Sequence, residues 1–181
     1  MTLAPVIPAP ALVGRADLIW FDCRGDAAKY DAGHVAGARH ASLDRDLSAP
    51  APDPALGGRH PLPELSTFAA CLGRWGVTPE SHLIAYDDQR GANAAARFWW
   101  LLRALGHARV QVVDGGLPAL IAAGFALTSE PPAPAPAPPY PASGWRLPIV
   151  DIDAVERARQ DPTWRVIDVR AAPRFRGESE P

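Results

Sequence analysis

Two cysteines carry the most reactive side chains in this sequence, and their surroundings decide whether either could act as a nucleophile. Cys23 stands between Asp22 and Arg24 directly after an apolar run, and Cys71 lies within the helix-like segment FAACLGRW. A cysteine attacks as its thiolate, and the ordinary thiol pKa of about 8.5 falls only beside cations or amide dipoles. Neither cysteine lies in a loop that would cradle an anion, so we interpret both as small buried hydrophobic residues.

Other polar residues beside the apolar runs indicate structure rather than catalysis. Asp22 with Arg24, and Asp168 with Arg170, are spaced to form ion pairs, and we expect His34 to bond backbone groups in its own turn. No pair of histidine, cysteine or carboxylate residues has the spacing of metal ligands. There is also no phosphate-binding loop and no dinucleotide-binding fingerprint. The sequence therefore predicts neither a metal nor a cofactor.

Composition narrows the class of protein. The 181 residues are 48% hydrophobic, which is enough to fill a core, and their formal net charge is −2. That charge favours neither nucleic acid nor an anionic membrane as a partner. The longest apolar runs are far shorter than the ~20 residues of a bilayer span, and the N-terminus does not have the pattern of a secretory signal. Since two cysteines do not make a disulfide framework, we expect a cytoplasmic protein.

Alternating strands and helices must position these residues. Short apolar runs that pass into turn-forming residues predict buried strands at 18–22, 82–86 and 110–113. Helical spacing followed by a glycine predicts helices at 64–75, 93–105 and 117–123. This alternation predicts an α/β fold with an open parallel sheet and helices on both faces.

A change in composition then divides the chain. Residues 131–141 (PPAPAPAPPYP) favour extended polyproline geometry and a semi-rigid spacer. After them the α/β pattern restarts, with a helix from Ile152 to about Gln160 capped by Asp151 and a strand at 165–168. We assign residues 1–127 to a first domain, 128–147 to a linker and 148–181 to the start of a second domain.

The restart repeats the first strand. WFDCR (20–24) is matched by VIDVR (166–170), and 146 residues separate the two Asp-x-Arg motifs. Tyr30 follows the first aspartate by eight residues, and Phe175 follows the second by seven. The second copy continues for only eleven residues after its motif, too few to complete a five-stranded sheet. The repeat therefore predicts the truncated beginning of a second copy of the first domain.

Several longer motifs follow one another along the chain. They are FDCR (21–24), GHVAGARH (33–40), GGRHPLP (57–63), IAYDDQRGANAAARFWWLLRALGH (84–107), VVDGG (112–116) and VIDVRAAPRFRG (166–177). In order and spacing they resemble the two-domain thiosulfate and 3-mercaptopyruvate sulfurtransferase family, from about residue 18 to the end. The GHxxGA motif is typical of the rhodanese fold, and the block 86–107 of the N-terminal domain of tandem members. Leu120 departs from the family, which usually has a tryptophan there, and this concerns packing.

The resemblance implies sulfur transfer through a cysteine persulfide. In that family the cysteine lies in the loop after the central strand of the C-terminal domain, where backbone N–H groups hold the anionic sulfur. Position 87 is the equivalent position in the first domain, and it holds an aspartate, which cannot form a persulfide. The resemblance implies that the first domain is non-nucleophilic and that the cysteine lies beyond Pro181. We expect Asp87 at the C-terminal end of a central strand, facing a crevice.

Three further residues correspond to family positions that bind the donor or move protons. Arg174 matches an arginine that holds the anionic end of the sulfur donor, and a solvated helix arginine is the alternative. Asp44 and His60 match a pair that mercaptopyruvate-type members use, in which the histidine relays a proton and the aspartate orients it. For His60, an ordinary loop histidine in a proline-rich surface segment remains equally open.

The function implied by the resemblance is transfer of sulfane sulfur from a small anionic donor, thiosulfate or 3-mercaptopyruvate. The acceptor would be cyanide, a thiol or thioredoxin. The alternative is a stand-alone inactive rhodanese module that binds a partner or an anion. A phosphatase of the related loop-cysteine type is excluded because position 87 is an aspartate. The second copy of the motif favours the enzyme, and we expect the 181 residues alone to be inactive.

Overall fold

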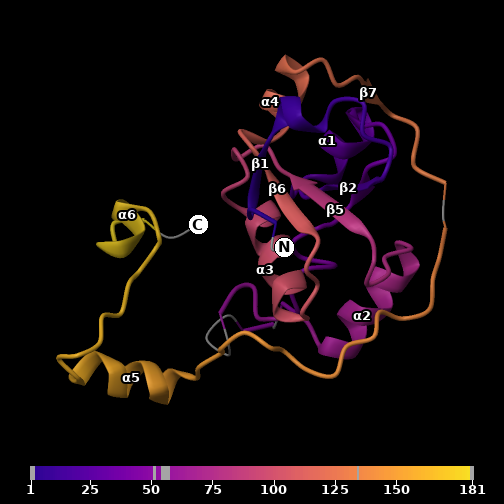
Figure 1. Cartoon of the computed structure of the whole chain (residues 1–181). Helices are drawn as coiled ribbons and strands as arrows, with labels where there is room; N and C mark the ends of the chain where they lie inside the picture. The colour runs from indigo at the N-terminus through magenta and orange to yellow at the C-terminus, as the bar shows by residue number, and fades with distance from the viewer. Residues whose placement is uncertain (1–2, 51, 54–57, 134, 180–181) are drawn as a thin grey trace. The chain divides into compact units, whose positions relative to one another are not determined.

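Five parallel strands form the central sheet of the computed structural model, which describes residues 3–50, 52–53, 58–133 and 135–179. The strands are β1 (Val6–Pro8), β2 (Leu18–Asp22), β4 (Arg39–His40), β5 (His82–Tyr86) and β6 (Val110–Asp114). Their order is β1-β6-β5-β2-β4, and every neighbouring pair is parallel. Figure 1 labels β1, β6, β5 and β2. The strands predicted at 18–22 and 82–86 are confirmed, and β6 is one residue longer than predicted.

Helices cover both faces of this sheet because side chains alternate along each strand. On β5, Leu83 and Ala85 belong to a core cluster shared with helices α2 (Leu65–Arg74) and α3 (Ala94–Ala104). Ile84 and Tyr86 point to the opposite face and pack with η1 (Ala9–Leu12) and α4 (Gly116–Ala122). The predicted open parallel sheet with helices on both faces is confirmed. Leu120 is fully buried in the second cluster.

The helices end where glycines were expected to end them. Gly76 after α2 and Gly106 after α3 have φ values of 70° and 87°, in the left-handed region that favours glycine. The N–H of Val77 donates to the carbonyl of Leu72 at 3.0 Å, and that of His107 to Leu102 at 2.9 Å. These bonds satisfy carbonyls that the helix end leaves unpaired. The predicted bounds of all three helices are within one residue of the structure.

Short strands at the periphery were not predicted. Edge strand β1 is held by the N–H of Val112, which donates to Pro5, and by the side-chain amide of Gln111, which donates to Ala4. After helix α1 (Ala27–Ala32), strand β3 (His34–Val35) pairs antiparallel with β7 (Leu127–Thr128) to form a separate two-stranded sheet. A strand of two or three residues carries too little hydrophobic pattern to be predicted from its sequence.

The proline-rich connector (residues 135–146) lies against the first unit instead of extending freely. Three of its backbone N–H groups donate to carbonyls of α2 and α3: Ala137 to Gly73 at 2.8 Å, Tyr140 to Ala69 at 2.9 Å and Arg146 to Ala104 at 2.6 Å. Tyr140 is buried, and its hydroxyl lies 3.0 Å from Nδ1 of His107. A Cβ on Gly73 would lie 2.6 Å from the carbonyl oxygen of Pro138, so the close approach depends on this glycine.

The chain divides into two compact units, residues 1–147 and 148–181. The second unit holds helix α5 (Ile152–Gln160), whose predicted cap is confirmed because the Asp151 carboxylate accepts from Ala154 N–H at 2.8 Å, and helix α6 (Ala172–Phe175). The predicted strand at 165–168 is wrong, since these residues have no regular secondary structure. A strand needs a neighbour to bond its backbone, and the described part of this unit holds no other strand.

Two further findings complete the description. Gly57, the first residue of the GGRHPLP motif, lies outside the described residues. Among the residues that the structure describes, no helix is long and apolar enough to cross a membrane.

Candidate functional site

The carboxyl ends of β2 and β5 lie side by side, because Asp22 and Tyr86 are register partners. Ligand sites of open α/β sheets form at this edge. The loop after β2 carries Cys23 and Arg24, and the loop after β5 runs from Asp87 to the start of α3 at Ala94. The sequence motifs are therefore gathered at the edge where the fold class places chemistry.

Asp87 follows β5, the middle strand of the sheet, as predicted. Its side chain is buried, and the residue is 1% exposed. The carboxylate accepts three backbone N–H groups of its own loop and one from the first turn of α3: Gln89 at 2.9 Å and Gly91 at 2.7 Å on Oδ1, and Asn93 at 3.2 Å and Ala95 of α3 at 3.1 Å on Oδ2. The expectation that Asp87 faces a crevice is wrong, because the short side chain turns back to satisfy these donors. The loop forms an anion cradle that its own carboxylate fills.

The Asp87 loop is held in place by close backbone contact with α4. Leu117 N–H donates to the Asp87 carbonyl at 2.9 Å. A Cβ on Gly116 would lie 2.4 Å from that same carbonyl oxygen, so only glycine allows this contact. Within the loop, Arg90 and Gly91 have φ values of 62° and 84°. Successive residues in this region turn backbone N–H groups toward a common centre.

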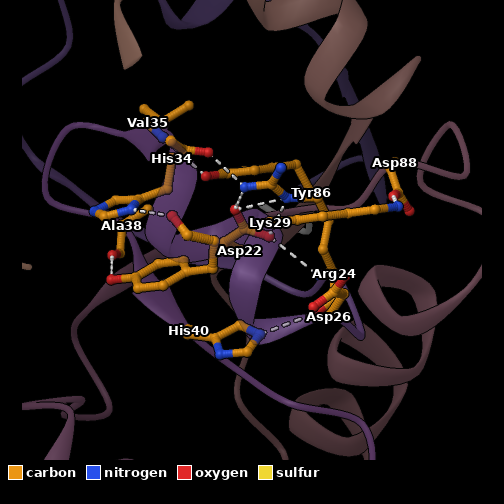
Figure 2. Close-up of polar contacts among 12 residues, drawn as sticks. Asp22, Arg24, Asp26, Lys29, His34, Val35, Ala38, His40, Tyr86 and Asp88 are labelled. Atoms are coloured by element: carbon orange, nitrogen blue, oxygen red, sulfur yellow. Dashed lines mark hydrogen bonds and ion pairs between the residues drawn. The ribbon is translucent and has the colours of Figure 1, made fainter. Parts of the chain in front are cut away.

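A second carboxylate of this loop binds a cation. Asp88 accepts from Lys29 Nζ at 2.8 Å, as Figure 2 shows. When Tyr30 is aligned with Phe175 of the repeated motif, Lys29 takes the position of Arg174. The first unit thus pairs its own cation at this position with its own carboxylate.

Asp22 and Arg24 form the predicted ion pair in the buried network of Figure 2. Nε of Arg24 donates to both carboxylate oxygens at 3.0 Å, and Nη2 donates to Oδ2 at 2.6 Å. Nη2 also donates to the carbonyl of Gly33 at 2.6 Å. His34 is likewise as predicted, since its ring nitrogens lie 2.8 and 3.1 Å from the carbonyls of Tyr30 and Glu130. These contacts fix the loop after β2.

Asp44 and His60, predicted as a pair, lie within hydrogen-bond distance. His60 Nε2 donates to Asp44 Oδ1 at 2.9 Å. Because a carboxylate only accepts, Nε2 carries a proton in this contact, and the other ring nitrogen, Nδ1, is the one left for a bound molecule. The imidazole is partly exposed, as proton exchange with a bound molecule requires. The geometry can therefore orient a general base or acid.

Arg97 holds the backbone that carries His60, and sequence reasoning missed it. Its guanidinium donates to three carbonyls: Leu47 at 2.7 Å, His60 at 2.9 Å and Pro61 at 2.9 Å. Arg97 lies on α3 directly before the buried Phe98, and burial lowers the pKa of the guanidinium. An arginine between AAA (94–96) and the apolar run FWWLL (98–102) was the available signal, because five N–H donors on a half-buried side chain require acceptors.

Neither cysteine is a reactive thiol. Cys23 is fully buried, and burial together with the carboxylates of Asp22, Asp87 and Asp46 raises its pKa well above the ordinary value. Burial and Asp46 raise the pKa of Cys71 to about 12. Both side chains are therefore neutral at physiological pH, and the interpretation of both as small buried residues is confirmed.

The remaining predicted site residue belongs to the second unit. Arg174 lies on α6, four residues after the ion pair of Asp168 with Arg170. In that pair Nη2 donates to Oδ2 at 2.6 Å. Within the described ranges, no group of three or more histidine, cysteine or acidic side chains gathers as a metal site.

Comparisons with known proteins agree with this architecture. The model of the rhodanese-like domain matches residues 9–123. A probable 3-mercaptopyruvate sulfurtransferase of Pseudomonas aeruginosa is 39% identical over 192 residues, which cover 100% of this chain and 66% of the relative. Human 3-mercaptopyruvate sulfurtransferase is 32% identical, with 84% of this chain and 50% of the relative covered.

A solved structure of a sulfurtransferase is also similar to this chain. The 3-mercaptopyruvate sulfurtransferase SseA of Escherichia coli superposes with a TM-score of 0.77 at 26% identity, covering 97% of this chain and 69% of that one. The chain spans between about half and two thirds of the length of the curated relatives named above. The match over residues 9–123, together with the parallel sheet and the loop that follows its middle strand, shows that this chain belongs to the rhodanese family.

Proposed function

We propose that the protein is a thiosulfate or 3-mercaptopyruvate sulfurtransferase whose nucleophilic cysteine belongs to a second rhodanese domain that begins at residues 148–181. The cysteine thiolate takes the sulfane sulfur of the donor, which releases sulfite or pyruvate, and the persulfide passes that sulfur to cyanide, a thiol or thioredoxin. Two unpaired cysteines fit the reducing cytoplasm, where we place the protein.

The observation that carries this proposal is the filled cradle at Asp87. The loop has the strand, the backbone donors and the following helix that an anionic persulfide requires, but the anion is a carboxylate. The described part of the chain offers no alternative nucleophile, since both thiols are buried and have raised pKa values. A sulfurtransferase built on this unit needs its cysteine in another domain, which is consistent with the longer relatives.

The contact between His60 and Asp44 favours 3-mercaptopyruvate as the donor. Release of pyruvate from this donor requires a proton, whereas sulfite leaves thiosulfate as a stable anion. A histidine oriented by a carboxylate can supply that proton. We therefore assign His60 and Asp44 to proton transfer, and Arg174 to the anionic end of the donor.

The proposed function is tested by comparing the full-length protein with the 181-residue chain. We expect thiocyanate formation from thiosulfate and cyanide, and pyruvate formation from mercaptopyruvate, only in the full-length protein. Cys23→Ser and Cys71→Ser should leave both activities intact. Turnover by the 181-residue chain that either substitution abolishes would show that the nucleophile lies in the first unit.

Substitution of His60 tests the choice of donor in the same protein. General acid–base catalysis contributes roughly 10²–10⁴-fold, so His60→Asn should lower pyruvate formation by about that factor. Thiocyanate formation from thiosulfate is the internal control and should change little. Equal loss with both donors would mean that His60 supports the structure rather than proton transfer.

A stand-alone binding module is the second candidate, and the filled cradle is the observation that favours it. An inactive rhodanese domain keeps its fold while its own carboxylate replaces the reactive anion. The same comparison decides between the two functions. A full-length protein that forms neither thiocyanate nor pyruvate would favour the module.

A further inference from the structure

A small pocket opens in the first unit, and it shares no lining residue with the Asp87 loop or with His60. Its volume is about 180 Å³, and strand β4, helix α1, the end of α2 and the connector region contribute to it. The lining residues are Tyr30, Arg39, His40, Arg74, Trp75, Pro132, Ala133 and Ala135. None of them was given a role by the sequence motifs, and neither the proposed sulfur transfer nor the Asp87 loop uses them.

Two arginines give this pocket its charge. Arg39 and Arg74 both line it, and none of the described residues around it is an acid. Within the described ranges neither arginine forms an ion pair, whereas Arg15, Arg24, Arg45 and Arg159 do. Two cations therefore share a small space in a chain whose formal net charge is −2.

Arg39 is the more informative of the two. It is half-buried, and burial lowers the pKa of its guanidinium while only Tyr30 acts in the opposite direction. Burying an unpaired charge costs free energy, and a bound counter-ion would reduce that cost. Arg74 lies in the last turn of α2, where a cation also complements the helix dipole. The dipole accounts for Arg74 but leaves Arg39 unexplained.

Nearby carboxylates do not neutralise the pocket. Asp22 and Asp31 are close enough to raise the pKa of Tyr30, but neither lines the pocket. Asp22 is already paired with Arg24. The ring of His40 contributes to the wall, and its Nε2 is engaged, since it donates to the carbonyl of Arg24 at 2.8 Å (Figure 2). The two guanidinium groups are thus the permanently charged groups of the pocket wall.

We propose that this pocket binds a small oxyanion of the sulfate or phosphate class. Guanidinium groups hold such anions through paired N–H donors, and the apolar wall of Trp75, Pro132 and Ala135 reduces competition from water. The volume suits a small tetrahedral anion, since pockets for larger molecules measure roughly 300–1,000 Å³. Because Pro132, Ala133 and Ala135 form one wall, the bound anion bridges this segment to β4 and α2.

Calorimetry and thermal unfolding of the 181-residue chain test this site without any assay of sulfur transfer. Sodium sulfate and sodium phosphate are titrated against sodium chloride at equal ionic strength. We expect saturable heat and a saturable rise in Tm with sulfate or phosphate and not with chloride. Preference for one of the two anions identifies the source of the ligand within this class.

Three substitutions locate the binding. Arg39→Gln and Arg74→Gln should each weaken the affinity at least tenfold, and Arg39→Lys should keep part of it. Arg74 is exposed, so its variant should fold even if Arg39→Gln does not. Arg109→Gln, an equal change of charge at an exposed arginine outside the pocket, is the matched control. A rise in Tm that does not saturate, or saturable binding that both glutamine variants retain, overturns the proposal.

Discussion

The two Asp-x-Arg motifs have the same local geometry in very different surroundings. In both, the backbone N–H of the arginine donates to Oδ1 of the aspartate, at 3.0 Å in the first unit and 2.9 Å in the second. Nη2 lies 2.6 Å from Oδ2 in each. The side chains of Asp22 and Arg24 are 0% and 8% exposed, whereas those of Asp168 and Arg170 are 27% and 43% exposed.

The short motif therefore encodes the ion pair, whereas the surrounding sheet determines whether that pair is buried. The arginine folds back onto the aspartate two residues before it, so the pair forms wherever the motif occurs. Burial of the pair requires the strands beside β2: β5 pairs with it along its whole length, and β4 pairs with Phe21 and Asp22 at its end. The first unit also pairs Lys29 with Asp88 and fills its cradle with Asp87, so the two carboxylates of the loop after β5 are satisfied internally.

Replacing the aspartate in each motif should give the largest contrast. Asp22→Asn leaves the Arg24 guanidinium buried without its counter-charge, and breaking a buried pair costs about 3–5 kcal/mol. Asp168→Asn should barely change stability, because water solvates the exposed arginine. Urea unfolding of the 181-residue chain measures both. Equal losses for the two variants would show that burial is not the source of the difference.

A smaller effect is expected at the cation that follows each motif. In the full-length protein, Arg174→Ala should lower kcat/KM by about one to two orders of magnitude, because a hydrogen bond to a charged group contributes roughly 1.5–3 kcal/mol. Arg174→Lys should recover part of the loss, since an ammonium group cannot make the two-point contact. Steady-state kinetics with both donors measures the change.

The equivalent residue of the first unit is the control for that experiment. Lys29→Ala should leave kcat/KM within about twofold, because Lys29 binds Asp88 rather than a donor. Arg176→Ala tests a neighbouring arginine in the second unit and should also have little effect. If Arg174→Ala is itself within twofold for both donors, the assignment of Arg174 to the donor is wrong.

The smallest effect concerns pH, and it should arise in the first unit, which holds all five histidines. Burial lowers the pKa of both His82 and His107. In the unfolded chain both histidines have the ordinary pKa of about 6.5. Below that pH the unfolded chain therefore binds more protons than the folded chain. Stability is fully present above that pH and is lost as the pH falls, by at most about 1.4 kcal/mol per pH unit for each histidine.

Urea unfolding at pH 8, 6.5 and 5.5 measures this loss. His107→Gln should make the decline shallower, while His60→Gln, at the partly exposed histidine, should not. Stability that is constant between pH 6.5 and 5.5 would contradict the lowered pKa of His82 and His107.

The sequence predicted the parts of the fold that carry strong local pattern. Strands β2 (LIWFD) and β5 (HLIAY) each hold an apolar run with one polar residue at an end, and glycines mark the ends of α2 and α3, so their bounds were accurate. Strand β1 was missed because Val6–Pro8 is short, lies at an edge and ends in proline. The strand at 165–168 was predicted from the same apolar pattern as β2, but a pattern alone cannot provide the neighbouring strand that pairing requires.

The site was predictable where one residue type determines the outcome. Aspartate at position 87 excluded a nucleophile there, and the neutral cysteines followed because neither lies in a loop that would cradle an anion. That the Asp87 carboxylate would turn into its loop depends on four N–H groups whose directions the backbone sets. Arg97 escaped notice for a similar reason, because its three acceptors are carbonyls, which every residue possesses.

The docked connector has a consequence for how the chain is cut. Proline-rich segments between domains are ordinarily where proteases separate them, because a protease must draw several extended residues into its cleft. Residues 137–146 are bonded to α2 and α3 through their own backbone, and Gly73 allows an approach that no larger residue would permit. Limited digestion should therefore spare this segment and cleave between Leu147 and Asp151, releasing a first fragment that retains its connector.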